Sequence, residues 1–270
     1  MKFSVLMSSY CKDKPEELKL ALRSIWDDQT LKPSEIVIVK DGPLTPELDA
    51  VLDNFASHAP VKFYPLEKNM GLGKALAIGV EACSCEYIAR MDGDDISVPD
   101  RFEKQVHFLE SNPEVSLCGG MIQEFNDTLD HLGGKRILPE SHDGIIQFSK
   151  WRSPFNHMTV MYRKQAILDV GNYQHFLFYE DYWLWARVLV HGYRTANLAD
   201  ILVNVRAGEG MLNRRRGWRF FKTELVLAKR LKEIGLINTF EMLRNMLLRS
   251  TARLLPSNIF SWIYSQFCRK

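Results

Sequence analysis

Residues 86–95, EYIARMDGDD, decide the fold of this 270-residue chain. Residues 86–91 are predicted to form a short buried strand, and Asp92, Asp94 and Asp95 follow at its C-terminal end. In an α/β sheet, ligands bind beyond the carboxyl ends of the strands. A buried strand that runs directly into a group of carboxylates therefore indicates a ligand site on a sheet of this class.

Three further strands are predicted upstream, over residues 3–8, 35–40 and 61–66. Amphipathic helices separate the four strands, over residues 15–25, 48–55 and 71–83, and Asp13 with Glu16 fits a capping box before the first of them. This alternation predicts a mostly parallel α/β sheet flanked by helices. Asp41 follows the second strand and so belongs to the same edge of the sheet as Asp92.

The pattern becomes less regular after Arg101. Strands are expected over residues 115–122, 159–163 and 201–206, and a helix over 180–191. From Trp218 onward only helices are expected, with breaks at Gly217, Gly235 and Pro256.

Charge is distributed unevenly, although the formal net charge is only +2. Residues 206–270 hold 14 Lys/Arg and 4 Asp/Glu, a net of +10, whereas residues 1–205 carry a net of −8. The acidic body argues against nucleic acid as a partner, and the basic C-terminal region predicts an anionic partner such as a membrane surface or a phosphate. Neither a signal peptide nor an apolar run of about 18 residues is recognisable. The five cysteines lack metal-ligand spacing, which favours a reduced, cytoplasmic protein.

Asp92 and Asp94 are the strongest candidates for metal ligands. Residues two apart on an extended chain point to the same side, so both carboxylates face one ligand together. Hard oxygen ligands suit Mg²⁺ or Mn²⁺. The alternative is a solvated turn or a helix cap, where Asp is also common.

Glu180 and Asp181 are the second acidic candidate, inside the aromatic run FYEDYW of residues 178–183. Partial burial among aromatic side chains raises a carboxyl pKa toward the range useful for a general base. The alternative is an ordinary helix start, where the helix dipole favours acidic residues.

Three weaker candidates remain. The run NMGLGKA, residues 69–75, is a glycine-containing helix start able to receive phosphate, but it lacks P-loop spacing. His157 precedes a strand, where a lone histidine is more often structural. Residues 214–216 are three arginines suited to a diphosphate, or to a solvated or lipid-contacting face.

In this order the motifs resemble those of bacterial family 2 glycosyltransferases of the GT-A fold, over residues 2–210. The likeness is carried by FSVLMSSY at residues 3–10, VIVKDG at 37–42, NMGLGKA at 69–75, DGDD at 92–95 and ED at 180–181. The resemblance implies that Asp94, helped by Asp92, holds Mn²⁺ or Mg²⁺, and that Asp181 is the catalytic base, assisted by Glu180. It also implies a binding site for a nucleotide-sugar donor that comprises Ser8, Tyr10, Asp41, Asn69, Lys74, Asp92, Asp94, Asp95, His157 and Arg206.

A narrower resemblance, to transferases that build O-antigen or exopolysaccharide repeat units, including the amylovoran type, rests on residues 156–164 and 205–208. It implies an inverting transfer of a hexose from UDP-glucose or UDP-galactose to a HexNAc on a polyprenyl diphosphate. It places the enzyme in the cytoplasm, peripheral on the inner face of the inner membrane.

The resemblance divides the chain into a catalytic domain, residues 1–210, and a basic amphipathic helical region, residues 211–270. Within the domain, about 1–100 form a donor half and 101–210 an acceptor half. We then expect deletion after Leu236 to leave a folded enzyme that no longer binds anionic membranes. Two alternatives stay open. A nucleotidyltransferase would carry a glycine-rich basic loop after its first strand, which residues 8–14 lack. A non-catalytic membrane-surface scaffold would need neither Asp94 nor Asp181.

Overall fold

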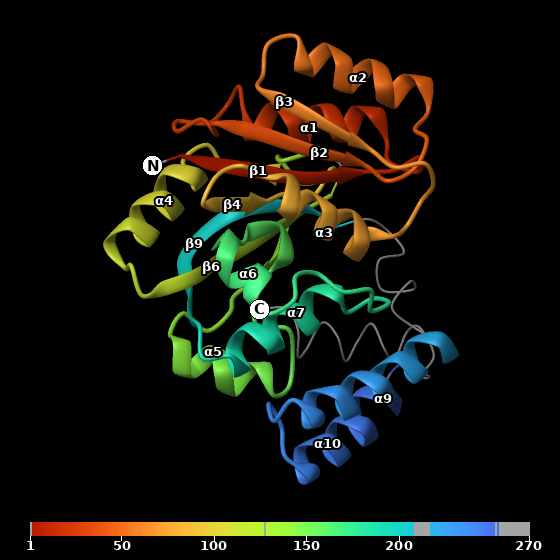
Figure 1. The fold of residues 1–270 in the computed structure, drawn as a ribbon, viewed down its shortest axis with the longest axis vertical. Helices are drawn as coiled ribbons and strands as arrows, with labels where there is room; N and C mark the ends of the chain where they lie inside the picture. Colours follow the sequence, from red (N-terminus) through yellow and green to blue (C-terminus); the bar gives the residue numbers. More distant parts are fainter. Residues whose placement is uncertain (1, 127, 208–216, 252, 254–270) are drawn as a thin grey trace.

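Four parallel strands form the N-terminal half of one nine-stranded sheet in the computed structural model, which describes residues 2–126, 128–207, 217–251 and 253 (Figure 1). They lie in the order β3-β2-β1-β4. Their bounds are Phe3–Ser9 for β1, Glu35–Lys40 for β2, Val61–Pro65 for β3 and Tyr87–Arg90 for β4. The predicted strands and their parallel pairing are confirmed, so β1, β2 and β4 end at the same edge.

The second half of the sheet is mixed. β8 (Met161–Arg163) pairs antiparallel with both β4 and β6 (Val115–Phe125) and joins the two halves. β9 (Arg194–Arg206) runs parallel to β6, and the short strands β5 (Ile96–Ser97) and β7 (Leu132–Arg136) complete the sheet.

β9 begins well before the predicted start at Ile201. Its register against β6 shifts around Gly120 and Met121. Such an irregularity interrupts the alternation of buried and exposed side chains, which was the only signal available from the sequence.

Helices cover both faces of the sheet because each strand alternates its side chains between two cores. Val5 and Met7 pack against α1 (Pro15–Ile25), α2 (Pro46–Ala56) and α4 (Arg101–Ser111). Leu6 packs on the other side with α3 (Leu72–Ala82), α6 (Lys164–Asp169) and α7 (Glu180–Val190). The expected capping box of α1 is wrong: the N-cap is Lys14, with no side-chain cap. The Asp13 carboxylate instead accepts from Ser9 Oγ at 2.9 Å and Tyr10 N at 3.0 Å.

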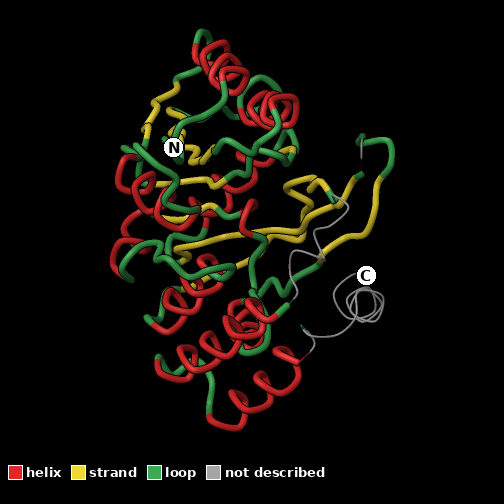
Figure 2. Tube along the Cα trace, turned by 90° about the vertical axis from the view of Figure 1, so that its right-hand side faces the viewer, coloured by secondary structure: helices red, strands yellow, loops and turns green. Residues whose placement is uncertain are grey.

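The C-terminal helices lie at the end of the molecule remote from β3 (Figures 1 and 2). α9 (Trp218–Glu233) begins after Gly217 and ends before Gly235, whose φ of +82° only glycine adopts easily, so both predicted breaks hold. α10 (Thr239–Asn245) continues into a π-helical segment, Met246–Ser250. A third apolar cluster packs α9 against α7. Pro256 lies outside the described residues. No helix in the described part of the chain combines the length and hydropathy needed to cross a bilayer.

Candidate active site

The acidic cluster Asp92, Asp94 and Asp95 follows β4 at the carboxyl edge of the sheet. One carboxylate oxygen from each residue lies within 4.8 Å of the others. Asp94 is exposed at the surface, Asp92 is half-buried and Asp95 is buried. The structure thus brings the two predicted ligands together and adds Asp95 to them.

Crowding of negative charge disturbs the titration of this cluster. Although the Asp94 side chain reaches the surface, desolvation by the surrounding protein, and then the charge of Asp92, raises its pKa to about 6. The same two causes raise the pKa of Asp95 well above its ordinary value. Carboxylates held this way are stabilised by a cation, and three oxygen donors suit Mg²⁺ or Mn²⁺. The residues present therefore fit the metal that the sequence motif implies.

Arg90, the last residue of β4, lies fully buried beneath the cluster and forms an ion pair with Asp92 through Nη1. Burial alone would lower the pKa of Arg90, but the attraction of Asp92 outweighs it and the pKa is raised. The same positive charge acts on Glu180 and on His157. Sequence reasoning missed Arg90, although a cationic residue in an apolar strand was a visible signal.

Glu180 and Asp181 form the first turn of α7, and both are half-buried. Burial, and then the neighbouring charge of Asp181, raises the pKa of Glu180 to about 7. The charge of Asp92 adds to this rise and the charge of Arg90 opposes it, so Glu180 lies within electrostatic reach of the acidic cluster. Glu180 therefore titrates near neutral pH.

The donor-side loop is fastened to the end of β2 by Asp41. This buried carboxylate accepts from Met70 N at 2.6 Å and from Gly71 N at 3.0 Å, and Asn69 Nδ2 donates to the Asp41 carbonyl at 3.2 Å. Gly42 permits the approach: its φ is +88°, and a Cβ there would lie 2.6 Å from Asn69 N. Asp41 thus orders the loop that carries the predicted donor motif, while Asn69 itself stays exposed.

α3 meets α7 at Gly73. A Cβ at this position would lie 3.1 Å from the Gln174 carbonyl oxygen and 3.2 Å from Glu180 Cβ. The absence of a side chain lets the donor motif approach the Glu180–Asp181 turn closely. Lys74, the next residue, is exposed on the first turn of α3.

The last residues of β1 and β9 border the acidic cluster. Arg206 donates its backbone N–H to Asp95 Oδ1 at 3.0 Å and Nε to the Asp94 carbonyl at 3.4 Å. Ser8 is half-buried near the end of β1, and Tyr10 is exposed just beyond it. Asp13, which the sequence assigned to a helix cap, adds a further negative charge near Asp92, and burial raises its pKa.

His157 lies below this edge, where its Nε2 is 2.9 Å from the Tyr173 hydroxyl and its ring packs against Trp185. Burial, and then the charge of Arg90, lowers the pKa of His157 well below its ordinary value, so the ring is neutral. Residues 214–216 lie outside the described part of the chain.

Comparison with known proteins identifies the family. The model of "Glycosyl transferase family 2" matches residues 4–176. The chain belongs to this family. The amylovoran biosynthesis glycosyltransferase AmsE of Erwinia amylovora is 45% identical over 269 residues, which cover 98% of both chains. The UDP-Gal:alpha-D-GlcNAc-diphosphoundecaprenol beta-1,3-galactosyltransferase of Escherichia coli is 36% identical, over 100% of this chain and 97% of its own length.

Solved structures agree on the GT-A fold. Residues 1–349 of S. aureus TarS in complex with UDP-GlcNAc superpose with a TM-score of 0.70 at 18% identity, over 98% of this chain and 78% of that TarS fragment. The mannosyltransferase PcManGT from Pyrobaculum calidifontis, in complex with GDP-Man and Mn²⁺, gives a TM-score of 0.61 at 14% identity, over 98% and 79%. Family membership makes this chain a glycosyltransferase and sets aside the nucleotidyltransferase and scaffold alternatives.

Proposed function

We propose that this chain is a metal-dependent, inverting hexosyltransferase that uses a UDP-sugar donor and a lipid-diphosphate-linked HexNAc acceptor. One observation carries the proposal: the buried cation Arg90 forms an ion pair with Asp92 of the acidic cluster and also acts electrostatically on Glu180. A site for a diphosphate–metal complex and a site for a base thus adjoin each other, as transfer of a sugar to a hydroxyl group requires.

Asp94 and Asp92 are the proposed metal ligands, with Asp95 behind them. Bound there, Mn²⁺ or Mg²⁺ would neutralise charge on the leaving diphosphate. Arg90 holds Asp92, and the backbone N–H of Arg206 holds Asp95, so two of the three carboxylates have fixed orientations. Asp94 has the most exposed carboxylate and faces the incoming donor.

Asp181 is the proposed base. Burial, and then the charge of Asp181, raises the pKa of Glu180 to about 7, so Glu180 is partly protonated at neutral pH, and we assign the ionised member of the pair to Asp181. A carboxylate that stays ionised at neutral pH is able to accept the proton of the acceptor hydroxyl. Glu180 then assists by donating a hydrogen bond and orienting its neighbour. Attack from the face opposite the diphosphate would invert the anomeric carbon.

The loop that Asp41 fastens is the proposed nucleotide site. We assign Ser8, Tyr10, Asn69 and Lys74 to this nucleotide site, and His157 and Arg206 to its floor and rim. In this scheme residues 1–100 mostly serve the donor and residues 101–210 the acceptor. The E. coli relative is a galactosyltransferase that uses UDP-Gal, which favours UDP-galactose over UDP-glucose, and the amylovoran relative favours a role in polysaccharide repeat-unit assembly.

The decisive test is transfer by the purified protein with Mn²⁺. UDP-glucose, UDP-galactose and their N-acetyl forms are each supplied with a synthetic GlcNAc-α-diphosphate lipid, and the linkage of the product is read by NMR. We expect a β-linked hexose, little product with Asp94→Ala, and a loss of about 10²- to 10⁴-fold with Asp181→Asn. Full activity in excess chelator would falsify the metal role. If Glu180→Gln is inactive while Asp181→Asn is nearly normal, Glu180 is the base and Asp181 the assisting residue.

We further propose that the enzyme lies on the cytoplasmic face of the inner membrane, peripheral to it. The net charge of +10 over residues 206–270 is accompanied by exposed apolar side chains on α10 and the π-helical segment. Phe240 is 75% exposed and Leu247 is 66% exposed, with Leu243 between them. Apolar residues flanked by Lys and Arg are typical of helices that lie in an anionic lipid interface.

Liposome flotation tests this second proposal. We expect the full chain to bind vesicles rich in phosphatidylglycerol at low salt, and a Phe240→Ser/Leu247→Ser variant to bind them several-fold more weakly. Leu20→Ser is the matched control, because Leu20 is 44% exposed on α1, in a helix of the other region. If the full chain ignores anionic vesicles at low salt, the C-terminal helices have no membrane role.

A further inference from the structure

A buried carboxylate ties the C-terminal helices to the helix that carries the proposed base. Glu224 on α9 is only 3% exposed. It accepts from the Tyr179 hydroxyl at 2.5 Å, and the guanidinium groups of Arg249 and Arg253 lie 3.1 Å and 2.7 Å away. We call these four residues the Glu224 cluster. It joins segments that are far apart in sequence, namely α9, the end of the π-helical segment and the start of α7.

The cluster is a fixed anion with two cations. Burial alone would raise the pKa of Glu224, but Arg249 and Arg253 outweigh it and the pKa is lowered. Glu224 is therefore ionised, and a hydrogen bond to a buried carboxylate is stronger than one between neutral groups. The Tyr179 hydroxyl is thus held firmly to α9.

Tyr179 is the N-cap residue of α7 and immediately precedes Glu180 and Asp181. The residue before it, Phe178, has a φ of +70°, a conformation that a bulky residue adopts only when its surroundings impose it. Its ring stacks on Phe220 of α9, with ring centroids 3.7 Å apart. Two consecutive side chains thus fix the start of α7 to α9.

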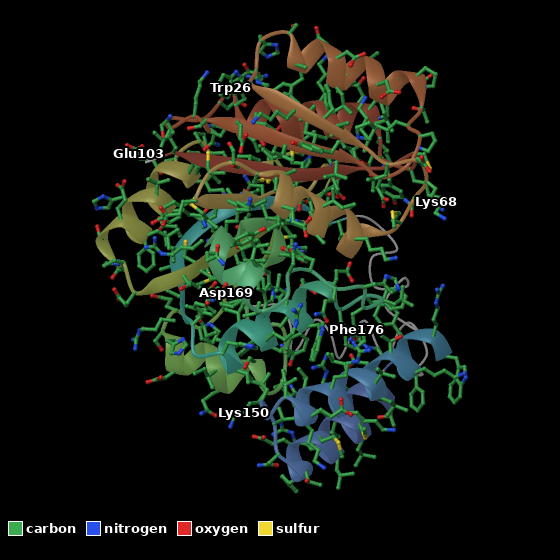
Figure 3. The ribbon with its side chains drawn as sticks, in the orientation of Figure 1. Trp26, Lys68, Glu103, Lys150, Asp169 and Phe176 are labelled. Atoms are coloured by element: carbon green, nitrogen blue, oxygen red, sulfur yellow. The ribbon has the colours of Figure 1, made fainter. Side chains whose placement is uncertain are left out.

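The preceding residues make a second contact of the same kind. Phe176, labelled in Figure 3, belongs to the loop before α7 and packs in one apolar cluster with Leu227 and Leu231 of α9. The Arg230 guanidinium lies 4.8 Å from the Phe176 ring centroid. The loop is therefore bounded by α9 on one side and, through Gln174, by Gly73 of the donor motif on the other.

We infer that the C-terminal helices position the base: through the Glu224 cluster, Tyr179 and Glu224 set where the Glu180–Asp181 turn stands relative to the acidic cluster. This inference rests on the proposed role of Asp181. Tyr179 and Glu224 are positioning residues, since they act through α7 and do not touch the reacting groups. A catalytic group displaced by about 1 Å costs up to about 10²-fold in rate.

The test compares Tyr179→Phe and Glu224→Gln with the full-length wild type. Tyr179→Phe removes one hydroxyl and keeps the ring, so it is the variant least prone to unfold. We expect kcat for transfer to fall about 10- to 10²-fold, with donor KM within about twofold of wild type. The affinity for UDP with Mn²⁺, measured by calorimetry, should stay unchanged. Glu35→Gln is the control: Glu35 is also buried and accepts from Ser4 Oγ and Ser84 N, each at 2.5 Å, at the opposite end of the sheet.

Glu35→Gln should lower the melting temperature but leave kcat as in wild type. A normal kcat in both Tyr179→Phe and Glu224→Gln, with melting temperatures lowered as in Glu35→Gln, would make the cluster purely structural and overturn the inference. Asp181→Asn separates the two proposals. If it loses about 10²- to 10⁴-fold in rate and Tyr179→Phe lowers its residual activity no further, the two residues act through one step, as we infer. If Asp181→Asn transfers normally, the base assignment fails and the inference fails with it.

Discussion

Replacing Arg90 with methionine removes a buried cation that forms an ion pair with Asp92 of the acidic cluster. Arg90 is fully buried and paired with Asp92, whose side chain is 29% exposed. Methionine fills much of the same space without a charge. In the metal-free variant, the three neighbouring carboxylates therefore lack the positive charge of Arg90.

The cost follows from breaking a buried ion pair. Removing one partner of such a pair costs about 3–5 kcal/mol, because the remaining charge is left uncompensated. Two unit charges about 4 Å apart interact by roughly 4 kcal/mol at an effective dielectric constant of 20, which is of the same size. At about 2–4 °C per kcal/mol, the melting temperature of the metal-free protein should fall by roughly 6–20 °C.

Thermal unfolding with and without Mn²⁺ measures the effect. Arg90 repels a metal held by Asp92 and Asp94, so its removal should strengthen Mn²⁺ binding by about tenfold or more, and the ion should restore part of the lost stability. Arg101→Met is the matched control. Arg101 is equally buried and donates to the Arg90 carbonyl at 2.7 Å and to Gln105 Oε1 at 3.0 Å, without a carboxylate among these hydrogen-bond partners.

Mn²⁺ should rescue Arg90→Met and leave the deficit of Arg101→Met unchanged. The reasoning is refuted if metal-free Arg90→Met melts at the wild-type temperature. It is refuted equally if Mn²⁺ stabilises wild type and both variants by the same amount, since Arg90 would then have no electrostatic link to the metal site.

The site and the C-terminal helices give four further predictions. The raised pKa of Asp94, about 6, predicts that Mn²⁺ affinity by calorimetry is constant above pH 7 and falls by up to about tenfold per unit below pH 6. The pKa values of Asp94 and Glu180 lie above their ordinary 3.8 and 4.5, so the folded protein binds more protons than the unfolded chain. The free energy of unfolding of the metal-free protein, measured by denaturant titration, should therefore fall as pH rises from 4 to 7. Asp41→Asn should raise donor KM more than it lowers kcat. An unchanged KM would show that Asp41 does not order the donor-side loop for binding. The sequence alone predicts that deletion after Leu236 leaves a folded enzyme. The structure predicts instead that the truncated protein has a lower melting temperature than wild type, because Glu224 stays buried without Arg249 and Arg253.

The parts of the fold that the sequence predicted are those encoded by neighbouring residues. β1 to β4 are short apolar runs between amphipathic helices, and the acidic cluster stands together because its members are adjacent in the chain. Glu180 and Asp181 were recognisable for the same reason. The donor motif and the Glu180–Asp181 turn were both visible, but their contact at Gly73 was not.

What the sequence did not reveal depends on contacts made only in the folded chain, between distant segments or within tight bends. Glu224 reads as an ordinary polar residue of an amphipathic helix, and only packing against α7 makes it the partner of Tyr179. Arg90 reads as the polar end of a strand until the chain turns and places Asp92 against it. Asp13 fits a cap by spacing alone, whereas its true partners, Ser9 and Tyr10, come from the bend after β1.

The close approach of α3 to α7 at Gly73 limits how such enzymes exchange parts. A hybrid enzyme that takes residues 1–100 from one parent and the remainder from another joins a foreign residue 73 to a foreign Glu180 turn. Even a methyl group there would meet Glu180 Cβ at 3.2 Å and the Gln174 carbonyl at 3.1 Å, so the turn would have to retreat by a few tenths of an ångström. Hybrid enzymes made to change donor preference will therefore be most active when both parents carry glycine at position 73.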